Sequence, residues 1–189
     1  MPQSMSLDDF ISFLRYRPVY KNIPENFNNL LDIGCGQNPW FKNLKNKNNL
    51  NIYGIDRFDS INIKDKNINY IKLEIENKLP FNDNFFDFIT MLAVLEHLDK
   101  DRDILNEIFR ILKPNGHFIL TVPTIYAKPI LEFLAFKLNL INRDSIREHK
   151  RYYTKNNLRD LIKKTGFNVN KIFYFEFGFN LFVLAQKPF

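Results

Sequence analysis

LLDIGCGQNPW, residues 30–40, is the stretch that decides the fold. Its apolar run, Leu30–Ile33, carries one acid, Asp32, and leads directly into the glycine-rich turn Gly34–Gly36. Both glycines of that turn accept backbone angles closed to other residues and let a bulky ligand lie against the main chain. Pro39 suits the first turn of a following helix, where its missing N–H costs nothing. The stretch therefore predicts a Rossmann-type strand end that binds a nucleotide-like ligand.

Two common nucleotide motifs are absent from this chain. The dinucleotide fingerprint needs a third glycine where the sequence has Pro39, and no GxxxxGK[ST] run occurs anywhere, which disfavours an NAD-dependent oxidoreductase and excludes a P-loop. The turn instead follows a carboxylate, Asp32. A buried acid needs a partner, and a cofactor that carries an ammonium group is a natural one.

Four ordered motifs between Leu30 and Phe167 carry a family resemblance. They are LLDIGCG (30–36), IYGIDRFD (52–59), LPFNDNFFDFITMLAVLEHL (79–98) and ILKPNGHFILTVP (111–123). With these motifs the chain resembles the class I S-adenosylmethionine-dependent methyltransferases, in particular the small-molecule, type 11-like enzymes. The resemblance implies S-adenosyl-L-methionine as the cofactor.

The resemblance also implies the residues that contact this cofactor. Asp56 closes a second apolar strand about 20 residues after Gly36, the distance at which an acid reaches ribose hydroxyls. Glu74, or Ile75 if the alignment slips by one, stands where the family contacts adenine. The full set implied for the cofactor is Asp32, Gly34, Cys35, Gly36, Asp56, Arg57, Glu74, Ile75, Leu92 and Ala93.

Alternating strand and helix patterns predict an α/β fold with a mostly parallel sheet and helices on both faces. The last two strands are separated only by a turn at Gly178 and must pair antiparallel. The family resemblance implies a seven-stranded, Rossmann-like sheet in the order 3-2-1-4-5-7-6. The strands are expected near residues 28–33, 51–55, 68–73, 86–92, 116–122, 169–177 and 180–187.

Histidines supply the candidate catalytic groups. His149 precedes an aromatic pair and Thr154, which is the expected cap of a helix, in a loop that the resemblance places above the pocket mouth. There His149 can deprotonate or orient an acceptor, and a structural role is the alternative. His97 is the second candidate, while Glu96 is expected to be structural, because neighbours on a helix point about 100° apart and form no dyad. His117 is assigned no role.

Two segments outside the motifs are expected to shape the acceptor site. Residues 1–27 predict a lid helix, and residues 124–150 a variable insertion within a single domain of 1–189. The insertion contains an apolar helix near 127–141, open to interpretation as core, substrate lid, dimer face or peripheral membrane contact. Arg15, Arg17 and Tyr20 are candidates for meeting an anionic acceptor.

Composition bounds the remaining possibilities. The 189 residues are 45% hydrophobic and 25% charged, typical of one globular domain, and no run is long enough to span a membrane. The single cysteine, Cys35, precludes disulfides and a cysteine-based zinc site, which fits a cytoplasmic protein, and no metal ligand is assigned. The net charge of +6 allows an anionic partner. The lysines are spread along the chain, however, and this pattern is typical of an ordinary solvent-exposed surface.

The function expected from the sequence is methyl transfer to an oxygen or nitrogen of a small-molecule acceptor, such as a sugar or lipid-linked compound. An RNA or protein methyltransferase and a non-catalytic cofactor-binding subunit are the alternatives. No Asn/Asp-Pro-Pro-Tyr/Phe motif follows the fourth strand, which disfavours base methylation and a nucleic-acid partner without excluding one. The sequence leaves a homodimer as a possible assembly.

Overall fold

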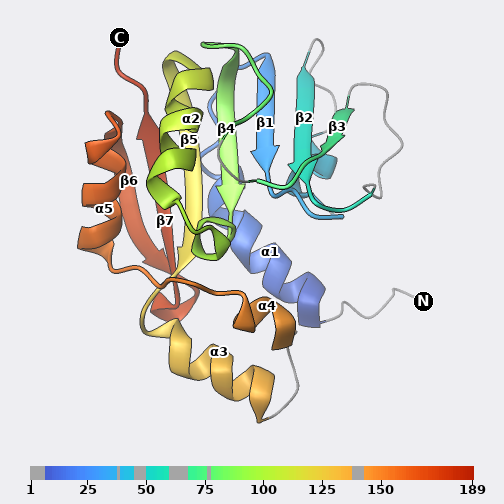
Figure 1. Cartoon of the computed structure of the whole chain (residues 1–189), viewed down its shortest axis with the longest axis vertical. Helices are drawn as coiled ribbons and strands as arrows, with labels where there is room; N and C mark the ends of the chain where they lie inside the picture. The colour runs from blue at the N-terminus through green and yellow to red at the C-terminus, as the bar shows by residue number, and fades with distance from the viewer. Residues whose placement is uncertain (1–6, 38, 45–49, 60–67, 76–77, 138–142) are drawn as a thin grey trace.

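A computed structural model describes residues 7–37, 39–44, 50–59, 68–75, 78–137 and 143–189, and seven of its segments form one sheet (Figure 1). The strands are β1 (Asn29–Ile33), β2 (Asn51–Asp56), β3 (Ile68–Lys72), β4 (Phe86–Leu92), β5 (Leu112–Pro123), β6 (Asn168–Phe175) and β7 (Asn180–Gln186). Strands β2, β3, β4 and β6 are rich in the β-branched and aromatic residues that fit a pleated surface.

The strand order is β3-β2-β1-β4-β5-β7-β6, which confirms the predicted order. Neighbouring strands from β3 to β5 pair parallel, and β7 runs antiparallel to both β5 and β6. The order reverses at β1, because β2 and β4 flank it on opposite sides. Ligands of open α/β sheets bind at such a switch point, outside the carboxyl ends of the strands.

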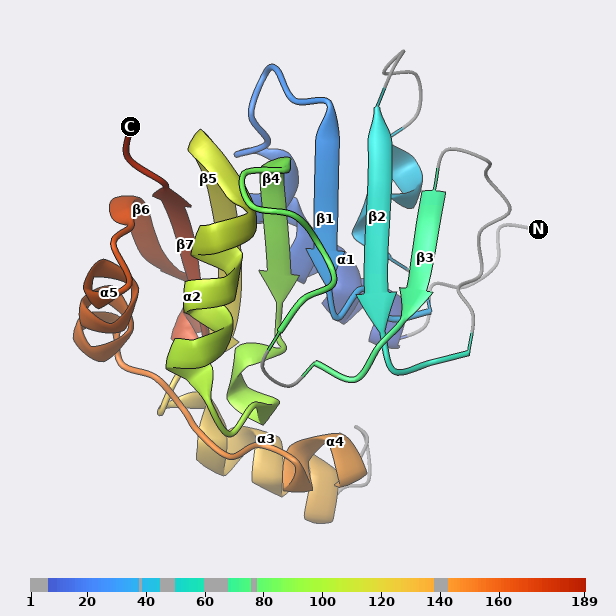
Figure 2. The same cartoon turned by 45° about the horizontal axis from the view of Figure 1, so that its top comes forward.

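Helices lie on both faces of the sheet, as predicted (Figure 2). Figure 2 shows α2 and α5 in front of the strands and α1 behind them, whereas α3 and α4 lie beyond the arrowheads of β1 and β4. The α-helices are α1 (Leu7–Tyr20), α2 (Asp101–Ile111), α3 (Ala127–Phe136), α4 (Arg143–Arg147) and α5 (Lys155–Lys164). Three short 3₁₀ turns are η1 (Trp40–Asn43), η2 (Leu95–His97) and η3 (Glu176–Gly178).

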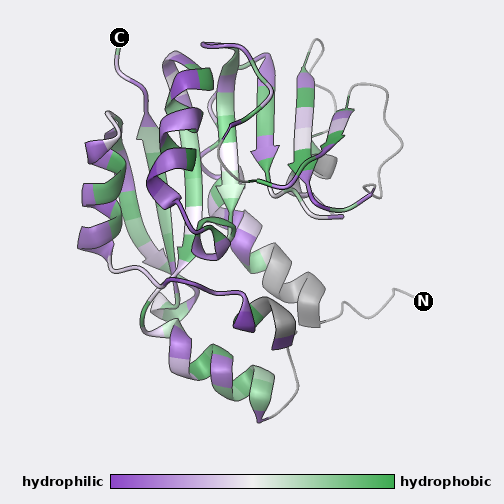
Figure 3. Cartoon of the chain, viewed as in Figure 1, coloured by the Kyte–Doolittle hydropathy of each residue, from purple (hydrophilic) through white to green (hydrophobic). Residues whose placement is uncertain are grey.

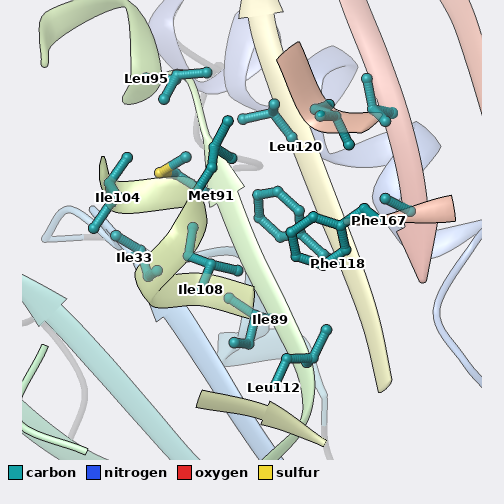
Figure 4. Close-up of a cluster of buried hydrophobic side chains, with 14 of the residues drawn as sticks. Ile33, Ile89, Met91, Leu95, Ile104, Ile108, Leu112, Phe118, Leu120 and Phe167 are labelled. Carbon is teal, nitrogen blue, oxygen red and sulfur yellow. The ribbon is translucent and has the colours of Figure 1, made fainter. Parts of the chain in front are cut away.

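The core is thickest between the sheet and α2. Ile104 and Ile108 of that helix meet Ile89, Met91 and other sheet side chains, all fully buried (Figure 4). A second cluster on the opposite face gathers Val19 of α1 with Trp40 and Phe88. Both layers hold β1 and β4 rigidly, and these two strands carry the turns that build the site.

The structure corrects three expectations about local elements. Pro39 lies one residue before η1 rather than inside a helix, and residues 45–49 of the expected helix lie outside the described residues. The fifth strand starts at Leu112, before the Lys-Pro-Asn-Gly turn, because Asn115 takes a left-handed conformation and the strand absorbs the turn as an irregularity. Glu176–Gly178 form a 3₁₀ turn instead of ending the sixth strand.

The apolar segment after β5 is not a core helix. Helix α3 ends at Phe136, and residues 138–142 lie outside the described residues. Along α3 the large apolar side chains of Ile130, Phe133 and Phe136 are exposed, Phe133 by 53%. Figure 3 shows green, hydrophobic stretches along α3, which lies below the sheet in this view. Among the described helices, none has the length and apolarity needed to cross a bilayer.

Candidate active site

The glycine turn after β1 forms the floor of the site. Its first glycine, Gly34, has φ of +70° and donates its N–H to the carbonyl of Ile55 in β2 at 2.8 Å. A Cβ at this position would approach Cγ2 of Val94 to 2.2 Å, whereas one at Gly36, also at positive φ, would enter open space. Gly34 is therefore required by packing, and Gly36 leaves its backbone bare toward the cavity.

Asp56 joins the glycine turn to the end of β2. Its carboxylate accepts the N–H of Gly36 and the N–H of Arg57, each at 2.7 Å, and the residue is 8% exposed. A carboxylate has further lone pairs beyond these two bonds. The residue thus fixes the turn and keeps acceptor capacity on the cavity side, which suits vicinal ribose hydroxyls.

Asp32 is the second acid of the floor and is nearly fully buried. It accepts a hydrogen bond from the hydroxyl of Thr90 at 2.6 Å, and that hydroxyl is held in turn by the indole N–H of Trp40 at 3.1 Å. Burial raises the pKa of Asp32 to about 7, despite the lowering effect of the hydrogen bonds from Thr90 and Trp40. A cationic ligand nearby would favour its ionised form.

These residues open into a cavity of about 800 Å³, within the size range of small-molecule pockets. Every residue that the sequence assigned to the cofactor lines it: Asp32, Gly34, Cys35, Gly36, Asp56, Arg57, Glu74, Ile75, Leu92 and Ala93. Cys35 is buried, and desolvation raises the pKa of its thiol. Cys35 therefore contributes an uncharged side chain to the cavity lining. The mixture of bare backbone, acids and apolar walls fits an adenosyl group with a cationic methionine portion.

The N-terminal helix and η2 also line this cavity. Helix α1 contributes Arg15 and Tyr16, and η2 contributes His97. The predicted N-terminal helix is thus present and borders the cavity. Arg17 is exposed, and Tyr20 donates its hydroxyl to the carbonyl of Trp40 at 2.5 Å. Of the three residues proposed to meet an anionic acceptor, Arg15 alone lines this cavity.

His149 reaches η2 from the loop after α4. The backbone N–H of Lys150 donates to the carbonyl of Glu96 at 2.8 Å, which pins this loop onto η2. The rings of His97 and His149 consequently meet edge to face with centroids 4.7 Å apart. The two sequence-predicted catalytic histidines are therefore neighbours, although 52 positions separate them.

Glu96 lies in the first turn of η2, where the sequence placed a structural acid, but it is buried. It is 1% exposed, and burial raises its pKa to about 7. The expectation that Glu96 and His97 face different groups is wrong: ligand atoms of both residues, together with one of His149, lie within 4.8 Å of one another. The pair lies in the 3₁₀ turn η2, and the loop that carries His149 packs onto this turn, which brings ligand atoms of all three residues together.

His149 is neutral at physiological pH. Desolvation, the neighbouring His97 and the charge of Arg15 lower its pKa to about 4. Its Nδ1 lies 3.1 Å from the Tyr152 hydroxyl, which holds the ring orientation. His117 lies at the other end of β5, beside Gln186, and lines neither cavity of the site, in keeping with the lack of an assigned role.

A second cavity of about 570 Å³ adjoins the histidine pair. His149 and Lys150 line it, and Lys150 also lines the first cavity. Its remaining walls combine apolar and charged side chains, which come from the end of β5, helices α3 and α4, and the loop that follows: Ile125, Lys128, Glu132, Phe136, Ile146, Arg147, Arg151 and Tyr152.

Several residues of the site escaped sequence reasoning. Thr90 sits inside the apolar strand FDFITML, and this lone polar residue was a usable signal for a buried hydrogen bond to Asp32. Glu148 and Lys150 flank a predicted residue and line the first cavity. Glu176 gave no local signal, because its place near Arg15 depends on the turn between β6 and β7.

Comparison with known proteins identifies the family. Residues 6–172 match the profile of a family described as a methyltransferase domain. A mitochondrial ubiquinone biosynthesis O-methyltransferase of Dictyostelium discoideum is 30% identical over 112 residues, which cover 50% of this chain and 35% of that protein. A ubiquinone/menaquinone biosynthesis C-methyltransferase of Vibrio cholerae is 41% identical over 70 residues, or 36% of this chain and 25% of that protein. The chain thus spans about a third or less of these curated relatives.

Solved structures share the fold at low sequence identity. The methyltransferase in a complex with the Trm112 activator of Haloferax volcanii superimposes with a TM-score of 0.78 at 14% identity, covering 96% of this chain and 92% of that one. An S-adenosylmethionine-dependent methyltransferase of Mesorhizobium loti gives a TM-score of 0.72 at 16% identity, covering 94% and 100%. The family resemblance stated from the four sequence motifs is confirmed, and the chain belongs to the class I S-adenosylmethionine-dependent methyltransferase domain family, with S-adenosylmethionine as its cofactor.

Proposed function

We propose that the protein transfers a methyl group to an oxygen or nitrogen atom of a small amphipathic molecule. The observation that carries this proposal is the meeting of two cavities at one histidine pair. His97 lines the larger cavity, His149 lines the smaller one, and their rings are in contact. A cofactor in the first cavity and an acceptor in the second would approach each other at this pair.

The larger cavity suits the cofactor because of what its residues offer. Asp56 is proposed to accept the ribose hydroxyls, Glu74 or Ile75 to contact adenine, and the backbone at Ala93 to meet the methionine portion. S-adenosylmethionine supplies an activated methyl group on a positively charged sulfur, so an acceptor needs chiefly a correctly placed lone pair. The acids Asp32 and Asp56 favour a cation in this cavity.

The smaller cavity suits an acceptor with an apolar part and a polar part. Ile125, Phe136 and Ile146 offer apolar surface, while Lys128 and Arg147 offer cations beside the acid Glu132. The exposed apolar face of α3 continues this surface outward. These features support a lipid-linked or prenylated acceptor with a polar head. The exposed apolar face of α3 also supports peripheral contact of this helix with a membrane.

The relatives point to the same chemistry. Two of them are named for methyl transfer in ubiquinone biosynthesis, one to oxygen and one to carbon. For this chain we propose a heteroatom acceptor, because polar side chains rather than an apolar wall surround the histidine pair. His149 is proposed to position the acceptor rather than to deprotonate it, since it lines the smaller cavity and its lowered pKa makes it a weak base.

The test is an acceptor screen with S-adenosylmethionine labelled in its methyl group. Hydroxylated aromatic acids and amines, each with and without a prenyl tail, are incubated with the protein beside total RNA and a protein extract. We expect label in a tailed, hydroxylated or aminated small molecule. Label confined to RNA or protein would replace the proposed acceptor class, and cofactor binding without any transfer would indicate a non-catalytic subunit.

A further inference from the structure

We propose that Glu96, His97 and His149 form a binding site for one divalent transition-metal ion at the acceptor side of the pocket. The metal site stands on geometry, whereas its use in methyl transfer to a hydroxyl group rests on the proposed function. It departs from the sequence expectation, which assigned no metal ligand because the chain has only one cysteine.

The three side chains bring one ligand atom each to a common point. These atoms all lie within 4.8 Å of one another, one from a carboxylate and two from imidazoles. Zinc binds such atoms at about 2.0–2.2 Å, so its ligands lie at most about 4 Å apart. Small side-chain rotations therefore suffice to close the set around one ion.

Unpartnered buried atoms are the second, independent sign of a ligand. Oε2 of Glu96 and Nδ1 of His97 are buried and have no hydrogen-bond partner in the described structure, and Glu96 is only 1% exposed. Buried polar atoms in native proteins are nearly always paired, because leaving them bare costs free energy. A bound cation would satisfy both atoms at once.

Neighbouring groups orient both imidazoles as metal ligands require. The Tyr152 hydroxyl lies 3.1 Å from Nδ1 of His149, which leaves Nε2 for the ion. The ring of His97 hydrogen-bonds the backbone of Glu148. Since Nδ1 of His97 is unpartnered, that bond belongs to Nε2 and presents a lone pair at Nδ1. Outer partners of this kind fix the tautomer and orientation of metal-bound histidines.

The surrounding charges permit a divalent cation. Arg15 is the cation that acts on both Glu96 and His149, and Glu176 in turn lies within its electrostatic reach. The other cations near His97 already have acidic partners: Arg57 pairs with Glu148 at 3.3 Å, and Lys150 with Asp99 at 2.5 Å. The site thus offers one buried carboxylate beside two imidazoles, and the two cations named beside His97 are both paired with acids.

The donor set selects the class of ion. Two imidazoles and a carboxylate bind zinc and iron(II) in open catalytic sites, whereas magnesium and calcium prefer oxygen alone. With three protein ligands, the ion keeps a position for an acceptor hydroxyl and lowers its pKa, so that the proton leaves to solvent. This chemistry narrows the proposed acceptor to a hydroxylated molecule.

The experiment measures metal binding without any acceptor. Untagged, metal-depleted protein is titrated with Zn²⁺ by calorimetry and with Co²⁺ by visible absorption, with Mg²⁺ as the hard-cation comparison. The variants are Glu96→Gln, His97→Gln and His149→Gln, with His117→Gln as the matched control outside the site. Tyr152→Phe removes only the outer partner of His149.

We expect one Zn²⁺ per chain and Co²⁺ bands that reflect nitrogen ligands, with much weaker binding of Mg²⁺. Each ligand variant should lose at least about 100-fold in Zn²⁺ affinity, and Tyr152→Phe about 10-fold, while His117→Gln is unchanged. Affinity for S-adenosylhomocysteine, measured on every variant, reports whether the fold and the cofactor cavity persist.

Two outcomes overturn the metal site. They are wild-type protein that binds S-adenosylhomocysteine but not Zn²⁺, and Zn²⁺ affinity that survives all three ligand substitutions. Failure of the wild type to bind S-adenosylhomocysteine would instead contradict the proposed function and leave the metal result to stand by itself.

Discussion

The two sides of the pocket are built in different ways. On the cofactor side, consecutive residues of the turn 34–36 and the ends of β1 and β2 supply backbone groups and two hydrogen-bonded acids. On the acceptor side, α1, η2, the loop around His149 and η3 each bring one or two charged or imidazole side chains. The first side is a local structure, and the second is an assembly of segments distant in sequence.

This contrast extends to how well the polar atoms are satisfied. The carboxylates of Asp32 and Asp56 accept hydrogen bonds from protein groups, whereas Oε2 of Glu96 and Oε1 of Glu176 are buried without partners. A satisfied surface is preorganised for its ligand. The unsatisfied atoms on the acceptor side have hydrogen-bonding or ligand capacity left for a bound group.

Gly34→Ala should have the largest effect, because it breaks the cofactor side at its backbone. The added Cβ meets Val94 at 2.2 Å and must also adopt φ of +70°, which together cost about 3–5 kcal/mol of unfolding free energy. Gly36→Ala is the matched control, since its Cβ enters open space and costs only about 1–2 kcal/mol. Urea unfolding measures both, and equal losses would contradict the packing role of Gly34.

Asp32→Asn tests how the buried carboxyl of Asp32 changes the free energy of unfolding with pH. Burial raises its pKa from 3.8 to about 7, so the folded protein binds this proton more tightly than the unfolded chain. The contribution of this bound proton to the free energy of unfolding is therefore fully present below about pH 4 and is lost as the pH rises through about 7. Relative to the variant, the wild type should lose about 2–4 kcal/mol over that range.

Glu96→Gln is the corresponding change on the acceptor side, where burial also raises the pKa to about 7. Glu96→Gln should therefore reduce the loss of unfolding free energy over the same pH range. Chemical unfolding at a series of pH values measures all three proteins. Curves that run parallel for wild type and Asp32→Asn would show that this carboxyl is ionised normally in the folded state.

Asp56→Ala should weaken cofactor binding by about 1–3 kcal/mol, or roughly 5- to 150-fold, by removing acceptors for ribose and the bond that fixes Gly36. Asp59→Ala is the control on the same segment, because that acid is exposed and, among the residues that the structure describes, its ion pair is with Lys72. Calorimetry with S-adenosylhomocysteine measures both. Unchanged affinity in Asp56→Ala would remove this residue from the cofactor contacts.

His149→Gln should have the smallest effect on the cofactor. Its affinity for S-adenosylhomocysteine should change by less than about 0.5 kcal/mol, because the residue lines the smaller cavity and not the larger one. Turnover should fall once an acceptor is known. A large loss of cofactor affinity would mean that the two sides of the pocket are not separable.

The cofactor side could be predicted from the sequence because its residues follow two consecutive strands and lie close together in the chain. The glycines after an apolar strand predicted the turn, and the spacing predicted Asp56 at the end of the next strand, although its hydrogen bond to Gly36 was not predicted. Strand order followed from the resemblance, and the antiparallel last pair from the short connection at Gly178. Thr154 was also predictable as a cap, and its hydroxyl accepts the N–H of Asn157 at 3.2 Å.

The acceptor side was only partly predictable, for reasons of tertiary structure. Glu96 and His97 were expected to face different groups, but the loop that carries His149 packs onto η2 and brings ligand atoms of all three residues within 4.8 Å of one another. The apolar residues near 127–141 left core, lid, dimer face and membrane contact open, and the exposure of Ile130 and Phe133 removes the core alternative. No local pattern records which loops meet at a strand end, so Glu148 and Glu176 gave no signal.

The central claim is that the cavity beside the glycine turn binds an S-adenosyl cofactor independently of the acceptor side. Calorimetric titration of the wild-type protein with S-adenosylhomocysteine, and separately with NADH, tests it most directly. We predict one S-adenosylhomocysteine per chain and no heat from NADH, with the same result for His149→Gln. Binding of NADH alone, or of neither compound, would contradict the claim.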